Sequence, residues 1–531
     1  MSQLIRLLSL PLLPFLLHLA ALPQPAAADC RLLRRGLSRD LLLLGTVLTD
    51  SGAEPDGAVF IRGGRIAFAG DVCRLSVQDG GDASVVDCSG GGGSVISPGF
   101  VNTHEHIDYA TVRPFAPSPR PAGHRHDWRL GARGHDLRAV AVNGSASAAV
   151  AWGELRHLFS GTTSVIGGEM APGLARNLDF RAGLGAGLND DTDDDGHRHG
   201  VAVYDTFPLK DKLGIMRHGD CDYGADAVTA AVAARHHRYI GHVGEGVGPE
   251  AANEFACLSS ATFDTTPAAG GGGLSADIMG PNVALVHALG LARRDFDVVA
   301  ARGAMVVWSP RSNMFLYGAT LDPSYLLASG ITVALGTDWL PSGSATMGRE
   351  AACAARAAHD GFGFDVAPRA LWEMATRNGA RVAGFEDVLG SLEAGKLADI
   401  VVFRPWSRGD DDDDDHIHTN HDNSDDPYAQ AIFAPQEAVD LVLRGGKLLL
   451  ASNPELRVLA SDPDICELVP FGGGDGKKKG KGKGKEEKLV CVADELGSSF
   501  ADLEADLRGV YPAVLPAVPP DEPPCRPFSY S

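Results

Sequence analysis

The chain has 531 residues, of which 44% are apolar, so it can bury a large core and fold as more than one structural unit. Its formal net charge of -21 disfavours nonspecific binding to nucleic acid, because phosphates would be repelled over most of the surface. Much of this charge lies in two acidic runs, residues 189–200 and 409–426, which are most simply solvated loops.

Residues 1–28 have the pattern of a secretory signal peptide. Arg6 stands in a short basic region, the apolar run "LLSLPLLPFLLHLAAL" follows, and small residues close the segment. We therefore expect cleavage after Ala28 and a secreted, extracellular protein. The alternative is an uncleaved anchor, but Pro11 and Pro14 interrupt the apolar run, which is short for a membrane span. No stable membrane anchor is expected elsewhere in the chain.

Nine cysteines fit an oxidising compartment. Because the count is odd, at least one cysteine must lie outside intramolecular pairs. Cys466 and Cys491 are a candidate pair that would staple the C-terminal extension. Asn143 begins an Asn-Gly-Ser sequon, which fits glycosylation of a surface loop in an exported protein.

Residues 41–98 contain short β-rich runs separated by Gly-containing turns, a pattern typical of a small antiparallel sheet. Gly63-Gly64 is predicted to form a hairpin turn. Residues 391–455 return to the same style in "GSLEAGKLADIVVF" and "AVDLVLRGGKLLL". The two chain ends are therefore expected to complete one small β-domain. Residues 456–531 are expected to form a low-complexity, Pro-rich extension.

Between these ends, residues 99–390 alternate β-rich runs with segments able to form helices. This alternation argues for parallel βαβ units in an α/β fold, and a TIM-type barrel is the commonest closed form. An open doubly wound sheet is the alternative, but it should carry a Gly-rich phosphate turn after its first strand, where this chain has histidines. The β-rich runs lie at residues 161–168, 200–208, 237–246, 282–290, 304–310 and 331–339.

Metal-binding side chains stand where four of the barrel strands are expected to end, which is where TIM barrels carry their active sites. Residues i and i+2 of a strand point the same way, so the first two histidines would share one side if their strand continues to Ile107. The side chains are His104 with His106, His242, His287 and Asp338.

A His-x-His pair is weak evidence by itself, because the chain has three more. What distinguishes the pair at His104 and His106 is the apolar run "VISPGFVN" directly before it. The other three have no such strand, and two of them lie in the acidic runs. They are His124/His126, His197/His199 and His416/His418.

Glu245 lies three residues after His242, and flanking glycines would let the backbone turn its carboxylate toward the metal. A hydrolytic metal site needs such a group, because the attacking water must lose a proton and the leaving nitrogen must gain one. The alternative is a surface glutamate in a Gly-rich turn. Ser309, Ser312 and Asn313 are expected either to hold their loop by hydrogen bonds or to contact substrate.

The chain resembles the amidohydrolase superfamily, in the branch that contains cytosine, guanine and methylthioadenosine deaminases and the triazine hydrolases. The resemblance covers about residues 41–450. It implies a distorted TIM (β/α) barrel, a small β-sandwich built from both chain ends, and one divalent metal per chain, zinc first and iron(II) as the alternative. The motifs that carry it are "PGFVNTHEH", "GTTS", "HVGE", "LVHALGL", "SPRSN", "ALGTDWLPSGS" and "GSLEAGKLADIVVF".

The resemblance also implies roles for the strand-end residues. His287 would hydrogen-bond the attacking water or the substrate, and Glu245 would shuttle protons. Asp338 would take a proton from the water besides binding the metal. The implied ligands are His104, His106, His242 and Asp338. Neutral imidazoles with a carboxylate suit zinc, and an open position for water gives a nucleophile near neutral pH.

These features predict a metal-dependent hydrolase that acts on a non-peptide carbon–nitrogen bond of a small-molecule substrate. The same site would also suit another leaving group, such as chloride or an ester, and a catalytically silent binding protein is the third alternative. A binuclear site would need a bridging lysine, for which Lys210 is the candidate. The sequence leaves a homo-oligomer open. The short interval between residues 208 and 239 predicts one compressed βα unit.

Overall fold

The computed structural model describes residues 30–75, 81–90, 93–138, 140, 146–167, 174–185, 187–188, 200–267, 274–406, 426–471, 486–510 and 521–526. The expected signal peptide, the sequon at Asn143 and most of both acidic runs lie outside these residues. No helix in the described part of the chain is both long and apolar enough to cross a membrane.

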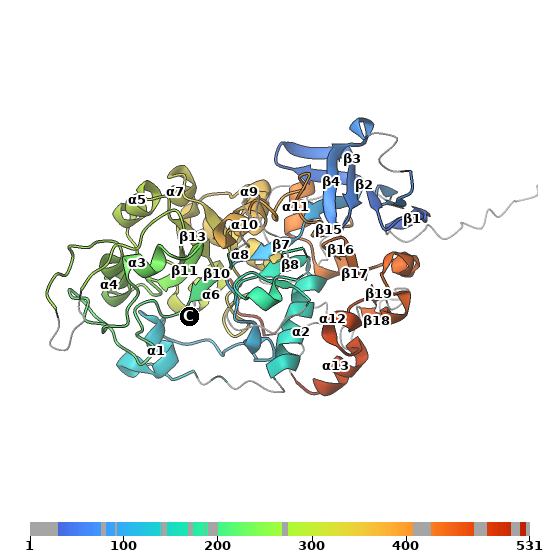
Figure 1. The fold of residues 1–531 in the computed structure, drawn as a ribbon. Coiled ribbons are helices and arrows are strands. Elements are labelled where there is room, and N and C mark those ends of the chain that lie inside the picture. The colour runs from blue at the N-terminus through green and yellow to red at the C-terminus, as the bar shows by residue number, and fades with distance from the viewer. Residues whose placement is uncertain are drawn as a thin grey trace, which may run out of the picture.

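A TIM-barrel-like fold forms the centre of the molecule (Figure 1). Strands β10 to β14 make one parallel five-stranded sheet, and β7 to β9 make a parallel three-stranded sheet. Backbone hydrogen bonds link the two sheets on both sides, from Ala202 N to Leu178 O at 3.0 Å and from Asp338 N to His104 O at 2.8 Å. The strands are β7 (Phe100–Asn102), β8 (Thr162–Val165), β9 (Arg176–Asn177), β10 (Ala202–Asp205), β11 (Arg238–Val243), β12 (Val283–His287), β13 (Met305–Trp308) and β14 (Val333–Leu335).

Helices alternate with these strands unevenly, so the barrel is distorted. Between β10 and β11 the described chain has only α3 (Ala230–Ala233), which confirms the compressed unit. Residues 368–383 form two helices rather than one, because the φ and ψ of Thr376, -124° and -96°, are not helical. The others are α1 (Arg125–Leu130), α2 (Ala146–Phe159), α4 (Pro249–Leu258), α5 (Arg293–Ala301), α6 (Pro310–Tyr317), α7 (Pro323–Ala328), α8 (Met347–Phe362), α9 (Pro368–Ala375), α10 (Arg377–Ala383), α11 (Pro427–Ile432), α12 (Ala493–Leu496) and α13 (Phe500–Asp506).

Strands from both chain ends share an eleven-stranded sheet, drawn in blue and orange-red to one side of the barrel in Figure 1. The two ends meet where β6 pairs antiparallel with β15. Gly63 and Gly64, at φ of 58° and 79°, form the predicted hairpin turn between β3 and β4. The strands are β1 (Arg31–Arg34), β2 (Leu41–Thr49), β3 (Gly52–Arg62), β4 (Arg65–Asp71), β5 (Ser84–Asp87), β6 (Val95–Pro98), β15 (Ile400–Phe403), β16 (Val439–Arg444), β17 (Lys447–Ala451), β18 (Glu467–Phe471) and β19 (Glu486–Val490).

Four disulfides cross-link the chain, and Cys73 remains as an exposed free thiol. The predicted Cys466–Cys491 pair is confirmed, and so is the odd cysteine. One disulfide, Cys353–Cys525, connects α8 to the C-terminal segment across 172 residues. The remaining two are Cys30–Cys88 and Cys221–Cys257.

Candidate metal centre

The predicted site residues converge at the C-terminal ends of the barrel strands. Three overlapping groups among them have ligand atoms that lie within 4.8 Å of one another. The side chains come from β11 and β12 and from the segments directly after β7, β11 and β14. The groups are His104 with His106 and His242, His104 with His287 and Asp338, and His242 with Glu245 and His287.

The first histidine pair reaches this centre by a different backbone from the one predicted. Strand β7 ends at Asn102 and a 3₁₀ turn begins at Ile107, so the condition under which the pair would share one side, a strand continuing to Ile107, is not met. Instead His106 N donates to Asp338 O at 3.1 Å, in an isolated bridge between the first and last strands of the barrel. This bridge keeps the alternation of side chains, so both imidazoles still face the centre.

Glu105, between the two histidines, points to the opposite side. Its carboxylate is buried 3.2 Å from both Arg156 Nη2 and His157 Nε2. Burial would raise the pKa of Glu105, but Arg156 and His157 lower that pKa to about 2. The ionised carboxylate therefore anchors the segment that carries the histidine pair.

The backbone is strained at two strand ends that supply the centre. His287 and Ala288 have φ of 67° and 51°, and Asp338 has φ of 63°. Residues other than glycine seldom adopt the left-handed region, and such strain is concentrated at functional sites. Here the strain turns the His287 and Asp338 side chains in toward the histidine cluster.

The distances between donor atoms fit one bound cation. His104 Nε2 lies 3.2 Å from His242 Nε2 and 3.2 Å from Asp338 Oδ1, and His106 Nε2 lies 3.6 Å from the same carboxylate oxygen. Ligands bound about 2.0–2.1 Å from a tetrahedral zinc ion lie roughly 3.3 Å apart. The four side chains therefore present a donor set that zinc would fit.

The protonation states of His106, His242 and Asp338 agree with this fit. Burial and the neighbouring imidazoles outweigh the Asp338 charge and lower the pKa of His106 to about 4. Burial and the neighbouring histidines put the pKa of His242 well below its ordinary value. Burial would raise the pKa of Asp338, but the surrounding histidines hold it well below its usual range. Neutral imidazoles and an ionised carboxylate are the forms that bind a metal.

Helix α6 and the residue before it hold three members of the centre. Ser309 Oγ lies 2.8 Å from His104 Nδ1, and Ser312 Oγ donates to Asp338 Oδ2 at 2.5 Å. Asn313 Oδ1 lies 2.9 Å from His287 Nδ1. These three side chains were expected to hold their own loop or to contact substrate, but their hydrogen bonds here go to the metal-centre side chains, which they orient.

Glu245 is buried beside the centre. Tyr317 donates its hydroxyl proton to Glu245 Oε1 at 2.7 Å, and His287 Nε2 lies 3.9 Å from the same oxygen. Arg125 Nη1 lies 3.6 Å from Oε2. Burial would raise the pKa of Glu245, but His287, Arg125 and the Tyr317 hydrogen bond hold it below its ordinary value. Glu245 is therefore ionised and able to accept a proton.

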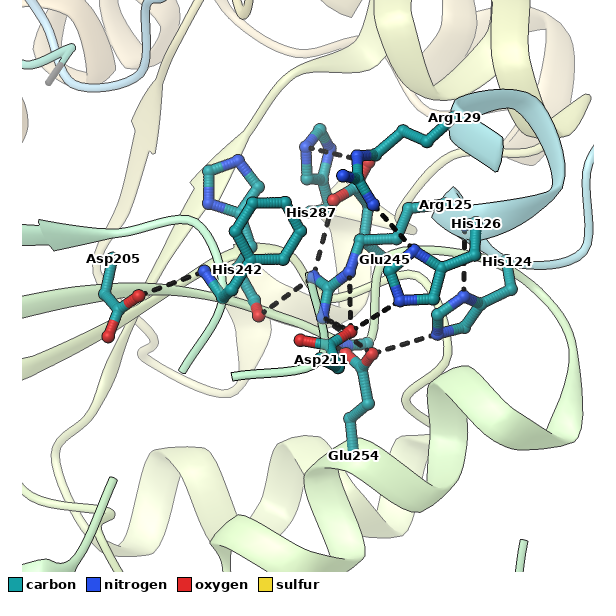
Figure 2. A network of polar contacts seen from close by, with 12 residues as sticks. His124, Arg125, His126, Arg129, Asp205, Asp211, His242, Glu245, Glu254 and His287 are labelled. Atoms are coloured by element: carbon teal, nitrogen blue, oxygen red, sulfur yellow. Dashed lines mark hydrogen bonds and ion pairs between the residues drawn. The ribbon is translucent and has the colours of Figure 1, made fainter. Parts of the chain in front are cut away.

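A buried polar network behind Glu245 includes the pair His124 and His126 (Figure 2). Arg125, between them, donates from Nη2 to Asp211 and to Glu254, both at 2.8 Å. His124 Nε2 lies 2.9 Å from Glu254 Oε1, and His126 Nε2 lies 2.8 Å from Asp211 Oδ2.

Although His124, Asp211 and Glu254 could group around a metal, the Arg125 guanidinium already supplies the cation there. This network was not predicted from the sequence, because its acidic partners lie 85 to 130 residues further along the chain.

Two more residues lie close to His106. Tyr204 Oη is 3.2 Å from His106 Nε2, and the Trp339 ring centroid is 6.1 Å from that of His106. Lys210, which a binuclear site would need, is instead half-exposed and pairs with Asp205 at 2.8 Å. The alternation of side chains along β10 was the signal that could have identified Tyr204 as facing inward.

Comparison with known proteins gives one matching family model and several relatives. The model of the amidohydrolase family matches residues 95–449. A 5-methylthioadenosine/S-adenosylhomocysteine deaminase of Desulforudis audaxviator is 39% identical over 125 residues, which cover 23% of this chain and 29% of that protein. The next two relatives are matched over the same 29% of their length. A 5'-deoxyadenosine deaminase of Methanothermobacter thermautotrophicus is 26% identical over 80% of this chain and 95% of its own.

Solved structures share the fold. An adenosine deaminase from Xanthomonas campestris with bound zinc is 19% identical, and the match covers 78% of this chain and 93% of the deaminase, with a TM-score of 0.52. Atrazine chlorohydrolase from Arthrobacter aurescens, also solved with zinc, is 19% identical over 77% of this chain and 95% of its own, with the same TM-score of 0.52.

Proposed function

The chain belongs to the amidohydrolase family, and from this membership and the geometry above we propose that it is a metal-dependent hydrolase of non-peptide carbon–nitrogen bonds. The observation that carries the proposal is the convergence of four histidines, Glu245 and Asp338 at one end of the barrel. The deaminases among its relatives support a carbon–nitrogen bond of a small molecule as the target.

In this proposal His104, His106, His242 and Asp338 hold one divalent metal, zinc first and iron(II) as the alternative. Asp338 Oδ2 accepts from Ser312, so Oδ1 is the oxygen that faces the histidines. When bound, the metal would supply a Lewis acid that lowers the pKa of water at the site. His104 would bind through Nε2, because Nδ1 is held by Ser309.

The protein's own residues then move the protons. Glu245, ionised and buried, accepts a proton from the attacking water and delivers it to the leaving nitrogen. His287 has Nδ1 on the amide oxygen of Asn313, so its Nε2 faces Glu245 and Asp338 at 3.9 and 4.0 Å. From there His287 would hydrogen-bond the water or the substrate. Asp338 is the second carboxylate placed to take a proton.

The proposal is tested with the purified full chain. We expect about one zinc per chain by metal analysis, loss of activity on chelation, and ammonia or amine release from a panel of cyclic amides, hydantoins, purines and pyrimidines. His104→Ala should lose both metal and turnover, because it removes a ligand at the middle of the cluster. His359→Ala, at an exposed histidine paired with Asp365, is the matched control and should keep both. An active, metal-free His104→Ala variant would contradict the proposal. Release of halide or alcohol alone would mean that the enzyme cleaves a bond to another leaving group.

The proposal also covers the location of the enzyme and the β-domain beside its barrel. We propose secretion, which is supported by the signal-like residues 1–28 and by four disulfides, because disulfides persist in oxidising compartments. We also propose that the strands shared by both chain ends form a β-sandwich beside the barrel, which the common sheet supports. The division into residues 41–98, 99–390, 391–455 and 456–531 stays a prediction.

A further inference from the structure

The C-terminal segment 521–526 lies against the barrel, far along the chain from the family match that ends at residue 449. The disulfide Cys353–Cys525 fixes it to α8. Met314 of α6 packs in the same small apolar cluster as the two cysteines. The segment therefore touches the helix that orients the metal-centre side chains.

Arg311 is the polar link between this segment and α6. Its guanidinium is fully buried and donates to Ser344 Oγ at 2.6 Å and to the carbonyl of Pro523 at 2.5 Å. Arg311 Nη1 also lies 3.5 Å from Glu522 Oε2. Arg311 directly precedes Ser312, whose hydroxyl holds Asp338. A shift of Arg311 would thus be transmitted to Asp338 through one residue.

Glu522 ties the same segment to α8. Its carboxylate accepts from Arg349 Nη2 at 2.7 Å and from Ala345 N at 2.9 Å, and its side chain is only 3% exposed. Without Glu522 and Pro523, the buried Arg311 guanidinium would lose two of its acceptors, which is costly for a buried charge. The tail is therefore part of the packed support under α6.

We propose that segment 521–526 positions the metal centre: the Cys353–Cys525 disulfide holds Glu522 and Pro523 on Arg311, and α6 then keeps Ser312 and Asn313 on Asp338 and His287. This inference rests on the proposed function, since it gives the tail a role in the same metal centre. Formation of one disulfide remote from the metal ligands thereby sets the metal affinity and the turnover of the enzyme.

Two variants of the full chain test the proposal. Cys353→Ser/Cys525→Ser removes the disulfide, and Glu522→Gln keeps the disulfide but removes the charge. Residues that orient metal ligands commonly change metal affinity by about 10–100-fold when mutated. We expect zinc affinity, measured by chelator competition, to fall about tenfold in both, and kcat to fall with less change in KM.

The matched controls are Cys30→Ser/Cys88→Ser, which removes a disulfide of the large sheet, and Glu504→Gln, at an exposed residue of α13. They should leave zinc affinity unchanged, even where the thermal midpoint falls. Unchanged zinc affinity and kcat in both test variants would overturn the inference. If the double cysteine variant does not fold, Glu522→Gln decides by the same measurements. Failure of the unmodified chain to bind either zinc or iron(II), or to turn over any substrate of the panel, would instead reject the proposed function.

Discussion

The pKa of the Glu245 carboxylate depends on single neighbouring side chains. Three neighbours favour its ionised form, and one of them, Tyr317, donates a neutral hydrogen bond at 2.7 Å. Tyr317→Phe should therefore raise the pKa of Glu245. Hydrogen bonds to charged groups contribute about 1.5–3 kcal/mol, or roughly one to two pH units.

Because Glu245 must be ionised to accept a proton, the acid limb of kcat/KM against pH should move upward in Tyr317→Phe by about that amount. Tyr325→Phe, which removes a surface hydroxyl paired with Asp297, is the control and should leave the profile in place. If the acid limb does not move, the group that titrates in it is not Glu245.

Arg125 is a second residue whose contacts predict the effect of a substitution. It is buried with Asp211 and Glu254, and its backbone N donates to the carbonyl of Glu245 at 3.1 Å. Arg125→Gln would leave two buried carboxylates without their cation, and breaking a buried pair in this way costs about 3–5 kcal/mol.

Chemical denaturation should show this loss in the free energy of unfolding. Arg31→Gln breaks the exposed pair with Asp87 and should cost about 1 kcal/mol or less. Equal stability of Arg125→Gln and the parent would mean that Arg125 is not the cation that balances Asp211 and Glu254.

At the scale of elements, the motifs predicted the strands that carry chemistry, while elements fixed by tertiary contacts escaped prediction. Strand β9 is only two residues long, which is too short for an alternation of apolar and polar residues to be recognised in the sequence. The His124/His126 spacing matched a strand-borne pair, yet His124 caps α1, because the capping box with Asp127 decides the local structure.

Helix α8 carries a buried carboxyl whose titration should be visible in stability. Burial raises the pKa of Glu350 to about 8, although Arg311 acts in the opposite direction. Between the ordinary value of 4.5 and about 8, the folded chain binds one more proton than the unfolded chain. Stability therefore falls as the pH rises through this window and the loss is complete above about 8.

Glu350→Gln keeps an acceptor for Arg311 N and removes this titration. The free energy of unfolding of the variant, relative to the parent, should rise from pH 5 to about pH 8 and then level off. Glu455→Gln at an exposed position should show a flat difference over the same range. A flat difference for Glu350→Gln as well would mean that Glu350 is ionised in the folded chain.

At the scale of the whole molecule, the sequence predicted the barrel and the centre because ordered motifs fix where the strands end. The tail was expected only as a Pro-rich extension, because its contacts with Arg311 and Arg349 join residues more than 170 positions apart. Contacts between residues so far apart leave no local sequence pattern from which they could be predicted. The same is true of Tyr317 and Glu245, which lie 72 residues apart.

Metal binding should stabilise the whole barrel, because the proposed ligands join its first and last strands. His104 follows β7, His242 lies in β11 and Asp338 follows β14, while the backbone hydrogen bonds between the first and last strands run from Thr103 to Leu335 and around the isolated bridge of Glu105 and Asp338. A ligand that binds only the folded state adds about 2.7 kcal/mol at 100 times its Kd. Thermal unfolding should thus shift to higher temperature as zinc is added to chelator-treated protein. His104→Ala should abolish the shift, whereas His359→Ala should retain it. If zinc raised the midpoint of His104→Ala as much as that of the parent, the stabilising ion would be bound elsewhere in the chain.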